Sequence, residues 1–200
     1  MIKIGLDLAF RTCGIAILKE DKLFYDSHVI KGRTLSNMAI QWEMTEWIFD
    51  QLEDYLLEDN ELILEDIFKG RNFEALKNTA RTQGAVVDRY LRITFNKNFP
   101  VYKMATTVRT TMGIPIQAPK VAIQLWAINK FNLGSLEVDF QKNITSKIEQ
   151  YYGVVNSKCK VDMKKKKILK RTLSEYSVRV ARITGVDEHM GDAIVLVCGG

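Results

Sequence analysis

The chain has 200 residues, of which 46% are hydrophobic, and a formal net charge of +5 at pH 7. These values exclude an intrinsically disordered chain and a pair of large lobes, and they predict one domain with a hydrophobic core. The first residues carry Lys3 and Asp7 and do not resemble a secretory signal. No stretch approaches the roughly 20 apolar residues of a membrane span. The three cysteines are scattered and form no C-x-x-C pair. We therefore expect a cytoplasmic protein with free thiols, no zinc cluster and no membrane partner.

The N-terminal half alternates between strand and helix patterns. Apolar residues at helical spacing predict helices at 35–57 and 73–93, each followed by a strand. The predicted strands are residues 2–8, 12–18, 23–30, 61–66 and 101–104. The first three follow one another closely, which indicates an antiparallel meander. The whole order predicts an α/β fold in which helices cross over between parallel strands.

Apolar stripes accompany these two predicted helices. The first helix places near one face Met38, Trp42, Thr45, Phe49, Leu52 and Leu56. The second helix aligns Leu76, Ala80, Gly84, Val87 and Leu91. The tryptophans lie at helical spacing among apolar residues, and we predict that all three are core residues, namely Trp42, Trp47 and Trp126.

The C-terminal half is predicted to be mostly helical. Residues 106–113 form a polar, Thr-rich loop that contains Arg109. Helices are predicted at residues 120–131, 139–152, 161–183 and 186–197. The third overlaps residues 157–182, where ten Lys and Arg residues stand against two acids, so the rest of the chain carries a net charge of −3. This basic patch suits a phosphate backbone, although a solvated helix face has the same composition.

Titratable residues at three distant places interrupt apolar runs. Asp7 lies in the first predicted strand, Glu65 follows the apolar run Leu62-Ile63-Leu64, and His189 and Asp192 lie one turn apart on the last predicted helix. A buried carboxylate is costly unless it is paired or binds a cation. If the first and fourth strands are neighbours, Asp7 lies beside Glu65. All four side chains then surround one point, which predicts a divalent-metal site.

A simpler explanation exists for each acid taken alone. Asp7 is at a strand end, where aspartate often caps a turn. Asp66 competes with its neighbour Glu65 for the same role. Asp187 and Glu188 suit the positive N-terminal end of a helix. The metal site is favoured by the combination of these residues and not by any one of them.

In the order and spacing of these residues, the chain resembles the RuvC family of Holliday junction resolvases, within the RNase H-like superfamily. The segment Ile4-Gly5-Leu6-Asp7-Leu8-Ala9-Phe10-Arg11-Thr12-Cys13-Gly14 is similar to an acid followed by a turn and a Gly-bearing strand. Glu65-Asp66-Ile67-Phe68 is similar to an acid that ends strand four, with an aromatic three residues on. His189-x-x-Asp192-Ala193 matches the third motif. The resemblance covers residues 1–113 and 160–198.

The resemblance implies a fold and a reaction. The fold would be a single RNase H-like nuclease domain over residues 1–200, with a mixed five-stranded sheet flanked by helices and an insertion at 114–160. The reaction would be phosphodiester hydrolysis with two Mg²⁺ ions, for which Mn²⁺ substitutes. Asp7 would bridge the ions, and Glu65 and Asp192 would each hold one. His189 would either coordinate a metal or orient the attacking water.

The resemblance also implies partners. Paired nicking of a four-way DNA junction needs a homodimer, and the helix 73–93 would form its interface. Phe68 would stack at the junction centre, with a core position as the alternative. The expected phosphate-binding residues are Lys69, Arg71, Arg109, Lys166, Lys167 and Lys170. Residues 101–113 resemble the family's next strand and its basic loop, which ends here at Gly113. The last three lysines are candidates to replace the lysine that normally follows the glycine of this loop. Such a divergent chain would fit a bacteriophage gene.

Other functions fit less well. Actin-like sugar kinases and ATPases also open with an aspartate in a strand-turn-strand, but they need a second lobe and Gly-rich phosphate loops that this sequence lacks. A non-catalytic junction-binding protein on the same fold would have lost the acids, and all four positions are filled here. A relaxed branched-DNA or flap endonuclease would carry the same site as a strict junction resolvase.

Overall fold

The computed structural model of the protein describes residues 1–32, 34–67, 73–95, 97–156 and 162–199. Three of the predicted DNA-binding residues, Phe68, Lys69 and Arg71, lie outside the described residues, as does Cys159. Cys13 and Cys198 are free thiols, as expected. No helix in the described part of the chain is both long enough and apolar enough to cross a lipid bilayer.

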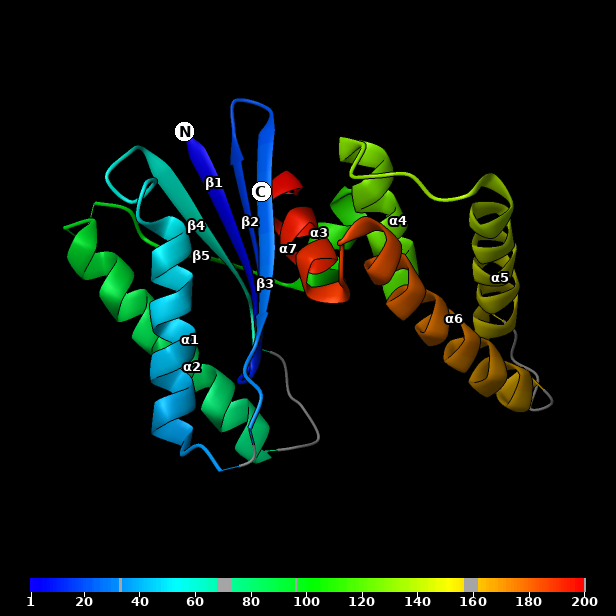
Figure 1. Ribbon diagram of the computed structural model, residues 1–200, viewed down its shortest axis with the longest axis horizontal. Helices are drawn as coiled ribbons and strands as arrows, with labels where there is room; N and C mark the ends of the chain where they lie inside the picture. Colours follow the sequence, from blue (N-terminus) through cyan, green and yellow to red (C-terminus); the bar gives the residue numbers. More distant parts are fainter. Residues whose placement is uncertain (33, 68–72, 96, 157–161, 200) are drawn as a thin grey trace.

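A five-stranded mixed sheet forms the centre of the molecule (Figure 1). Its strands are β1 (Ile2–Leu8), β2 (Thr12–Lys19), β3 (Lys22–Val29), β4 (Asn60–Glu65) and β5 (Val101–Lys103), and they lie in the order β3-β2-β1-β4-β5. β1, β2 and β3 pair antiparallel, whereas β4 pairs parallel with both β1 and β5. The predicted meander and the predicted pairing of the first and fourth strands are both confirmed.

Seven helices flank the sheet in the described residues. They are α1 (Asn37–Leu52), α2 (Phe73–Ile93), α3 (Ala105–Thr111), α4 (Lys120–Phe131), α5 (Val138–Asn156), α6 (Asp162–Thr184) and α7 (Glu188–Cys198). The bounds of α2 and α4 agree with the prediction, whereas α3 replaces a predicted loop. Its threonines do not break the helix because the hydroxyls of Thr110 and Thr111 donate to the carbonyls of Thr106 and Thr107 one turn earlier, at 2.8 and 3.1 Å.

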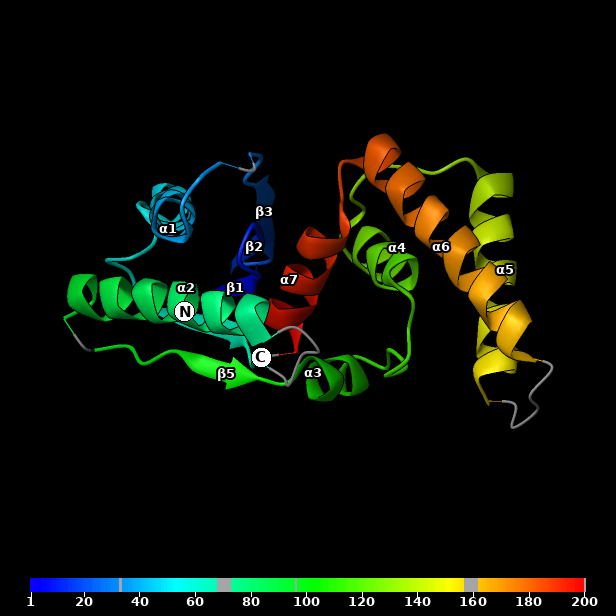
Figure 2. The same ribbon diagram turned by 90° about the horizontal axis from the view of Figure 1, so that it is seen from below.

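The two faces of the sheet have different coverings, as Figure 2 shows end on. α1 and α2 cover one face, where Ile4 and Leu6 of β1 enter the main core together with Leu62 and Leu64 of β4. α7 covers the other face, and Ile63 packs there with Val195 and Leu196. Because side chains alternate along a strand, Asp7 and Glu65 point to the α7 face.

The buried face of α1 is the predicted one only in part, since Thr45, Phe49 and Leu52 are buried as predicted. An aliphatic row at four-residue spacing enters the core through Ile40, Met44, Ile48 and Leu52, whereas Met38 is 80% exposed and Trp42 is 67% exposed. Trp42 is therefore not a core residue. Trp47 and Trp126 are partly buried against the hydrophobic clusters, so they agree with the prediction only in part.

α1 also ends earlier than predicted, at Leu52 and not at residue 57. The side-chain amide of Asn60 donates to the carbonyls of Tyr55, Leu56 and Glu58, at 3.0, 3.2 and 2.9 Å. Asn60 in turn accepts a hydrogen bond from the Tyr90 hydroxyl at 2.5 Å. These bonds fix a compact turn that leads directly into β4, so a helix to residue 57 has no room to form.

A second core lies beside the sheet, between α4, α5 and α6. It is built by buried residues of all three helices, including Leu125, Ile144, Leu173 and Val180. α5 and α6 run side by side as a hairpin that extends away from the sheet (Figures 1 and 2). The segment expected to be an insertion, residues 114–160, contains α4 and α5.

Candidate functional site

Two carboxyl side chains meet where the parallel strands β1 and β4 end. Leu6 lies opposite Leu64 in this pairing, so the next residues, Asp7 and Glu65, are neighbours on the α7 face. A hydrogen bond joins their carboxyl groups. Burial, together with the charges of Asp7 and Asp192, raises the pKa of Glu65 to about 8. Glu65 therefore holds the proton that this pair shares.

His189 approaches the same pair from α7. Its Nδ1 lies 2.7 Å from Asp7 Oδ2 and donates to it, while its Nε2 lies 3.7 Å from Glu188 Oε1. The hydrogen bond to Asp7 raises the pKa of His189. Burial opposes ionisation of Asp7, but His189 outweighs it and lowers the pKa of the carboxyl. The two side chains thus form a mutually stabilised ion pair.

Two glycines allow α7 to lie this close to the sheet. A Cβ atom on Gly14 would stand 2.2 Å from the backbone carbonyl group of His189, and one on Gly5 would stand 2.7 Å from the carbonyl oxygen of Ala193. Gly14 is also the residue opposite Asp7 in the β1–β2 register. Any side chain at Gly14 would therefore push His189 away from Asp7.

Asp192 lies one turn after His189 and is only 6% exposed. Arg109 Nη2 of α3 donates to its Oδ1 at 2.8 Å, and Lys120 Nζ, at the first residue of α4, donates to its Oδ2. Burial disfavours the charge on Lys120, but the neighbouring Asp192 outweighs it and raises the pKa of the amine. Both oxygens of this buried carboxylate are thus paired with cations.

We call Asp7, Glu65, His189 and Asp192 the carboxylate site. The structure brings Asp7, Glu65 and His189 into contact and places Asp192 near enough for its charge to act on Glu65. It also adds a residue that sequence reasoning missed. Lys120 is the lysine nearest in the chain after Gly113, the glycine of the segment that resembles the family's basic loop. A lone lysine at a helix start has no periodic pattern, so only its place after that glycine could have identified it.

The competing acids lie elsewhere. Asp66 is exposed. Asp187 is the N-cap of α7, because its Oδ1 accepts from the Met190 backbone N–H at 2.8 Å, and its Oδ2 accepts from the Ser27 hydroxyl at 2.5 Å. It is therefore a helix-capping acid, which is the simpler of the two explanations offered by the sequence.

A cavity of about 320 Å³ lies between the two cations that hold Asp192 and helix α6. Its walls include Arg109 and Lys120 on one side, Lys170 and Ser174 of α6 on the other, and Glu188 at the start of α7. Lys170 therefore shares a cavity with the two cations that hold Asp192. Lys166 and Lys167, by contrast, lie one turn away along α6 and do not line it.

The donor set has the chemistry of a divalent-cation site, namely three carboxylates and an imidazole. Its present arrangement is closed, since Arg109 and Lys120 hold Asp192 and His189 holds Asp7. Among the described residues, no group of three or more such side chains is arranged as a metal cage. The raised pKa of Glu65 marks an excess of negative charge that a cation would relieve.

No protein-family model and no curated protein sequence matches this chain. Solved structures do match it. A structure of T. thermophilus RuvC in complex with Holliday junction substrate is similar over 100% of this chain and 91% of its own, with a TM-score of 0.58 and 11% identity. Another Thermus thermophilus RuvC structure covers 100% and 92%, with a TM-score of 0.56 and 12% identity. At such identities the likeness shows the fold, and the predicted RNase H-like fold is confirmed.

Proposed function

We propose that the protein is a metal-dependent endonuclease that resolves four-way DNA junctions by paired nicking. The observation that carries this proposal is the convergence of Asp7, Glu65, His189 and Asp192 at the carboxyl ends of β1 and β4. The same fold is found in T. thermophilus RuvC, which was solved with Holliday junction substrate. The proposal treats residues 1–200 as a single nuclease domain.

Asp7, Glu65 and Asp192 would hold two Mg²⁺ ions, or Mn²⁺ in their place, with Asp7 shared between them. Bound there, such ions supply an activated water and neutralise charge on the scissile phosphate. Arg109 and Lys120 each pair with one oxygen of Asp192 and would bind phosphate oxygens. When they do so, Asp192 is released from its two ion pairs.

His189 has one ring nitrogen left for chemistry. Its Nδ1–H donates to Asp7, so Nε2, once it has lost its proton, is the atom that would coordinate metal or orient the attacking water. Because the bond to Asp7 fixes the direction of the ring, Nε2 has a defined position at the site. His189 therefore depends on the packing of α7 against Gly14.

The partner would be a second copy of the chain, through α2. The buried face of α2 is formed by Asn78, Thr82, Gln83, Val86 and Tyr90. The apolar stripe that the sequence predicted is a different one, in which Ala80 and Gly84 are exposed and Leu76, Val87 and Leu91 are only half-buried. Val87 and Leu91 pack against the main core, whereas Ala80 and Gly84 are exposed. The exposed part of the stripe supports the proposed two-fold interface, which would place two sites for paired cuts. Sedimentation as a monomer at micromolar concentration, with and without junction DNA, would contradict it.

The deciding experiment compares cleavage of a four-way junction, a Y-fork, a flap and a linear duplex in Mg²⁺, with the cut positions mapped. We expect symmetric paired cuts in the junction and little cleavage of the duplex. Equal cleavage of fork and flap would instead indicate a relaxed branched-DNA endonuclease. Asp7→Asn should keep junction binding and lose cleavage, and full cleavage by this variant would overturn the assignment of the site.

A further inference from the structure

Helix α6 carries a concentration of positive charge that the ion pairs of the carboxylate site do not account for. The helix Asp162–Thr184 contains eight Lys and Arg residues and two acids. α5, its partner in the hairpin, contains two lysines and two acids and has no net charge. The two helices pack on the same core, so packing does not explain the difference between them.

Four of the eight cations of α6 share one exposed face. Lys164, Lys167, Lys170 and Arg171 are spaced by three or four residues and are all exposed, and we call them the α6 basic face. Lys166 is half-buried and does not belong to it. Within the described part of the chain, Arg171 pairs with Glu175 at 3.0 Å, whereas no ion pair holds Lys164, Lys167 or Lys170.

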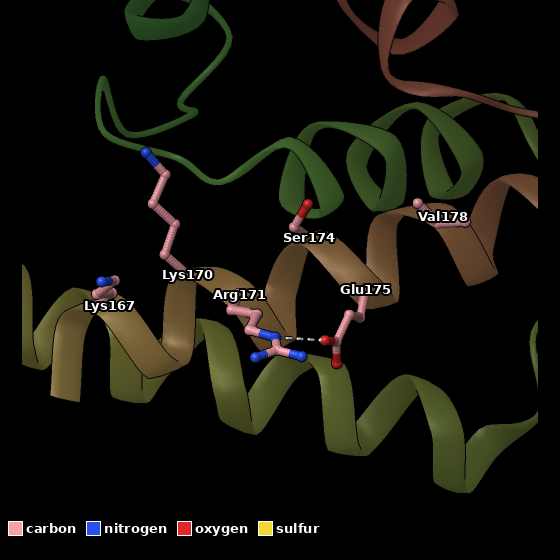
Figure 3. Close-up of a pocket in the computed structure, with 6 residues that line it drawn as sticks. All are labelled: Lys167, Lys170, Arg171, Ser174, Glu175 and Val178. Carbon is pink, nitrogen blue, oxygen red and sulfur yellow. Dashed lines mark hydrogen bonds and ion pairs between the residues drawn. The ribbon is translucent and has the colours of Figure 1, made fainter. Parts of the chain in front are cut away.

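This face extends to the two cations that hold Asp192. Lys167, Lys170 and Arg171 line a surface cavity of about 400 Å³ on α6. Figure 3 shows the side chain of Lys170 extending from α6 toward the chain segment that precedes α4. Lys170 also lines the cavity of Arg109 and Lys120. A row of cations therefore runs from the partners of Asp192 outward along the N-terminal half of α6.

We propose that the α6 basic face is a second phosphate-binding site, which holds a duplex arm of the DNA outside the cleavage site. This inference rests on the proposed function and names how that site takes its substrate. Lysines without protein partners are available to phosphates, and releasing the counterions of the phosphates drives such binding. α6 has 23 residues and spans about 34 Å, which is roughly one turn of duplex DNA.

The contacts would be independent of sequence. Lysine and arginine on an exposed helix face reach phosphate oxygens, whereas reading of base edges requires side chains inserted in a groove. The α6 basic face would thus add affinity and fix the direction of the arm, while selectivity for a branch point stays with the residues around the carboxylate site.

The test compares two variants with the same loss of charge on the same hairpin. Lys167→Gln/Lys170→Gln removes two lysines of the α6 basic face, and Lys142→Gln/Lys147→Gln removes the two lysines of α5. Junction binding is measured with EDTA present over a salt series. Each lost phosphate contact reduces the magnitude of the slope of log affinity against log salt concentration by about 0.9. The slope of the α6 variant should therefore be smaller in magnitude by about 1.8, and the slope of the α5 variant should equal that of the wild type.

Two further measurements make the result specific. Lys167→Arg/Lys170→Arg keeps the charge and should restore the wild-type slope. Hydroxyl-radical footprinting should show protected phosphates on an arm beside the branch point, and the α6 glutamine variant should lose that protection alone. Equal slopes for the α5 and α6 glutamine variants would overturn the inference. The α6 basic face would then be a solvated helix face that does not bind DNA.

The outcome also separates this inference from the proposed function. Binding is measured without metal and without cleavage. A protein that binds DNA through α6 but cuts none of the branched substrates would contradict the proposed function alone. A protein that cuts junctions with an unchanged salt slope in the α6 variant would contradict the second phosphate site alone.

Discussion

The carboxylate site and the α6 basic face use charge in opposite ways. At the carboxylate site Asp7 and Asp192 are held by ion pairs, and the Asp7–His189 contact is set by backbone packing against Gly14. On α6, by contrast, lysines stand exposed and without ion pairs among the described residues. Buried charge is costly and therefore tightly positioned, whereas exposed charge costs little and acts by number. A single substitution at the carboxylate site should accordingly abolish cleavage, whereas each substitution on the α6 basic face should reduce DNA affinity by a similar step.

The largest effect is expected for Glu65→Gln. This change keeps the shape of the side chain but removes a proposed metal ligand, so cleavage should fall on the order of 10³-fold or more. Asp66→Asn is the matched control, because Asp66 is adjacent in sequence and exposed. Single-turnover cleavage of a junction measures both. If Asp66→Asn lost cleavage and Glu65→Gln retained it, Asp66 would be the metal ligand in place of Glu65.

Lys120→Gln should reduce cleavage by about 10²-fold, since it removes a charge next to the position proposed for the phosphate. Its control is Lys130→Gln, at the exposed end of the same helix α4, which should cleave at the wild-type rate. Equal rates for Lys120→Gln and the wild type would show that the pair of Lys120 with Asp192 serves folding alone.

Gly14→Val should separate packing from chemistry. The new side chain would meet the backbone of His189 and displace α7, which should lower the free energy of unfolding by about 1–3 kcal/mol and abolish cleavage. Gly153→Ala is the control of opposite sign, because nothing lies within 4 Å of its Cβ position in helix α5. It should raise stability by up to about 1 kcal/mol in urea unfolding. A fully active Gly14→Val protein would show that His189 is not needed near Asp7.

The sequence predicts the strand order and the meeting of Asp7 with Glu65 well, because alternation and the parallel pairing of two apolar strands leave few other arrangements. It fails where a pattern has two solutions. Apolar residues surround much of α1, so periodicity correctly placed Phe49 and Leu52 in the core but could not show that Trp42 is exposed while Ile40 is buried. The role of Gly14 was out of reach for a different reason, since it depends on how closely α7 packs in three dimensions.

The smallest effects concern stability at the two regions. Asp187→Ala removes the N-cap of α7 and its bond from Ser27, so the free energy of unfolding should fall by about 1 kcal/mol. Lys167→Gln, on an exposed face, should change it by less than about 0.5 kcal/mol. Urea unfolding of both variants measures the difference. If Lys167→Gln cost as much as Asp187→Ala, Lys167 would be bound within the protein fold, and it would not be available to a phosphate backbone.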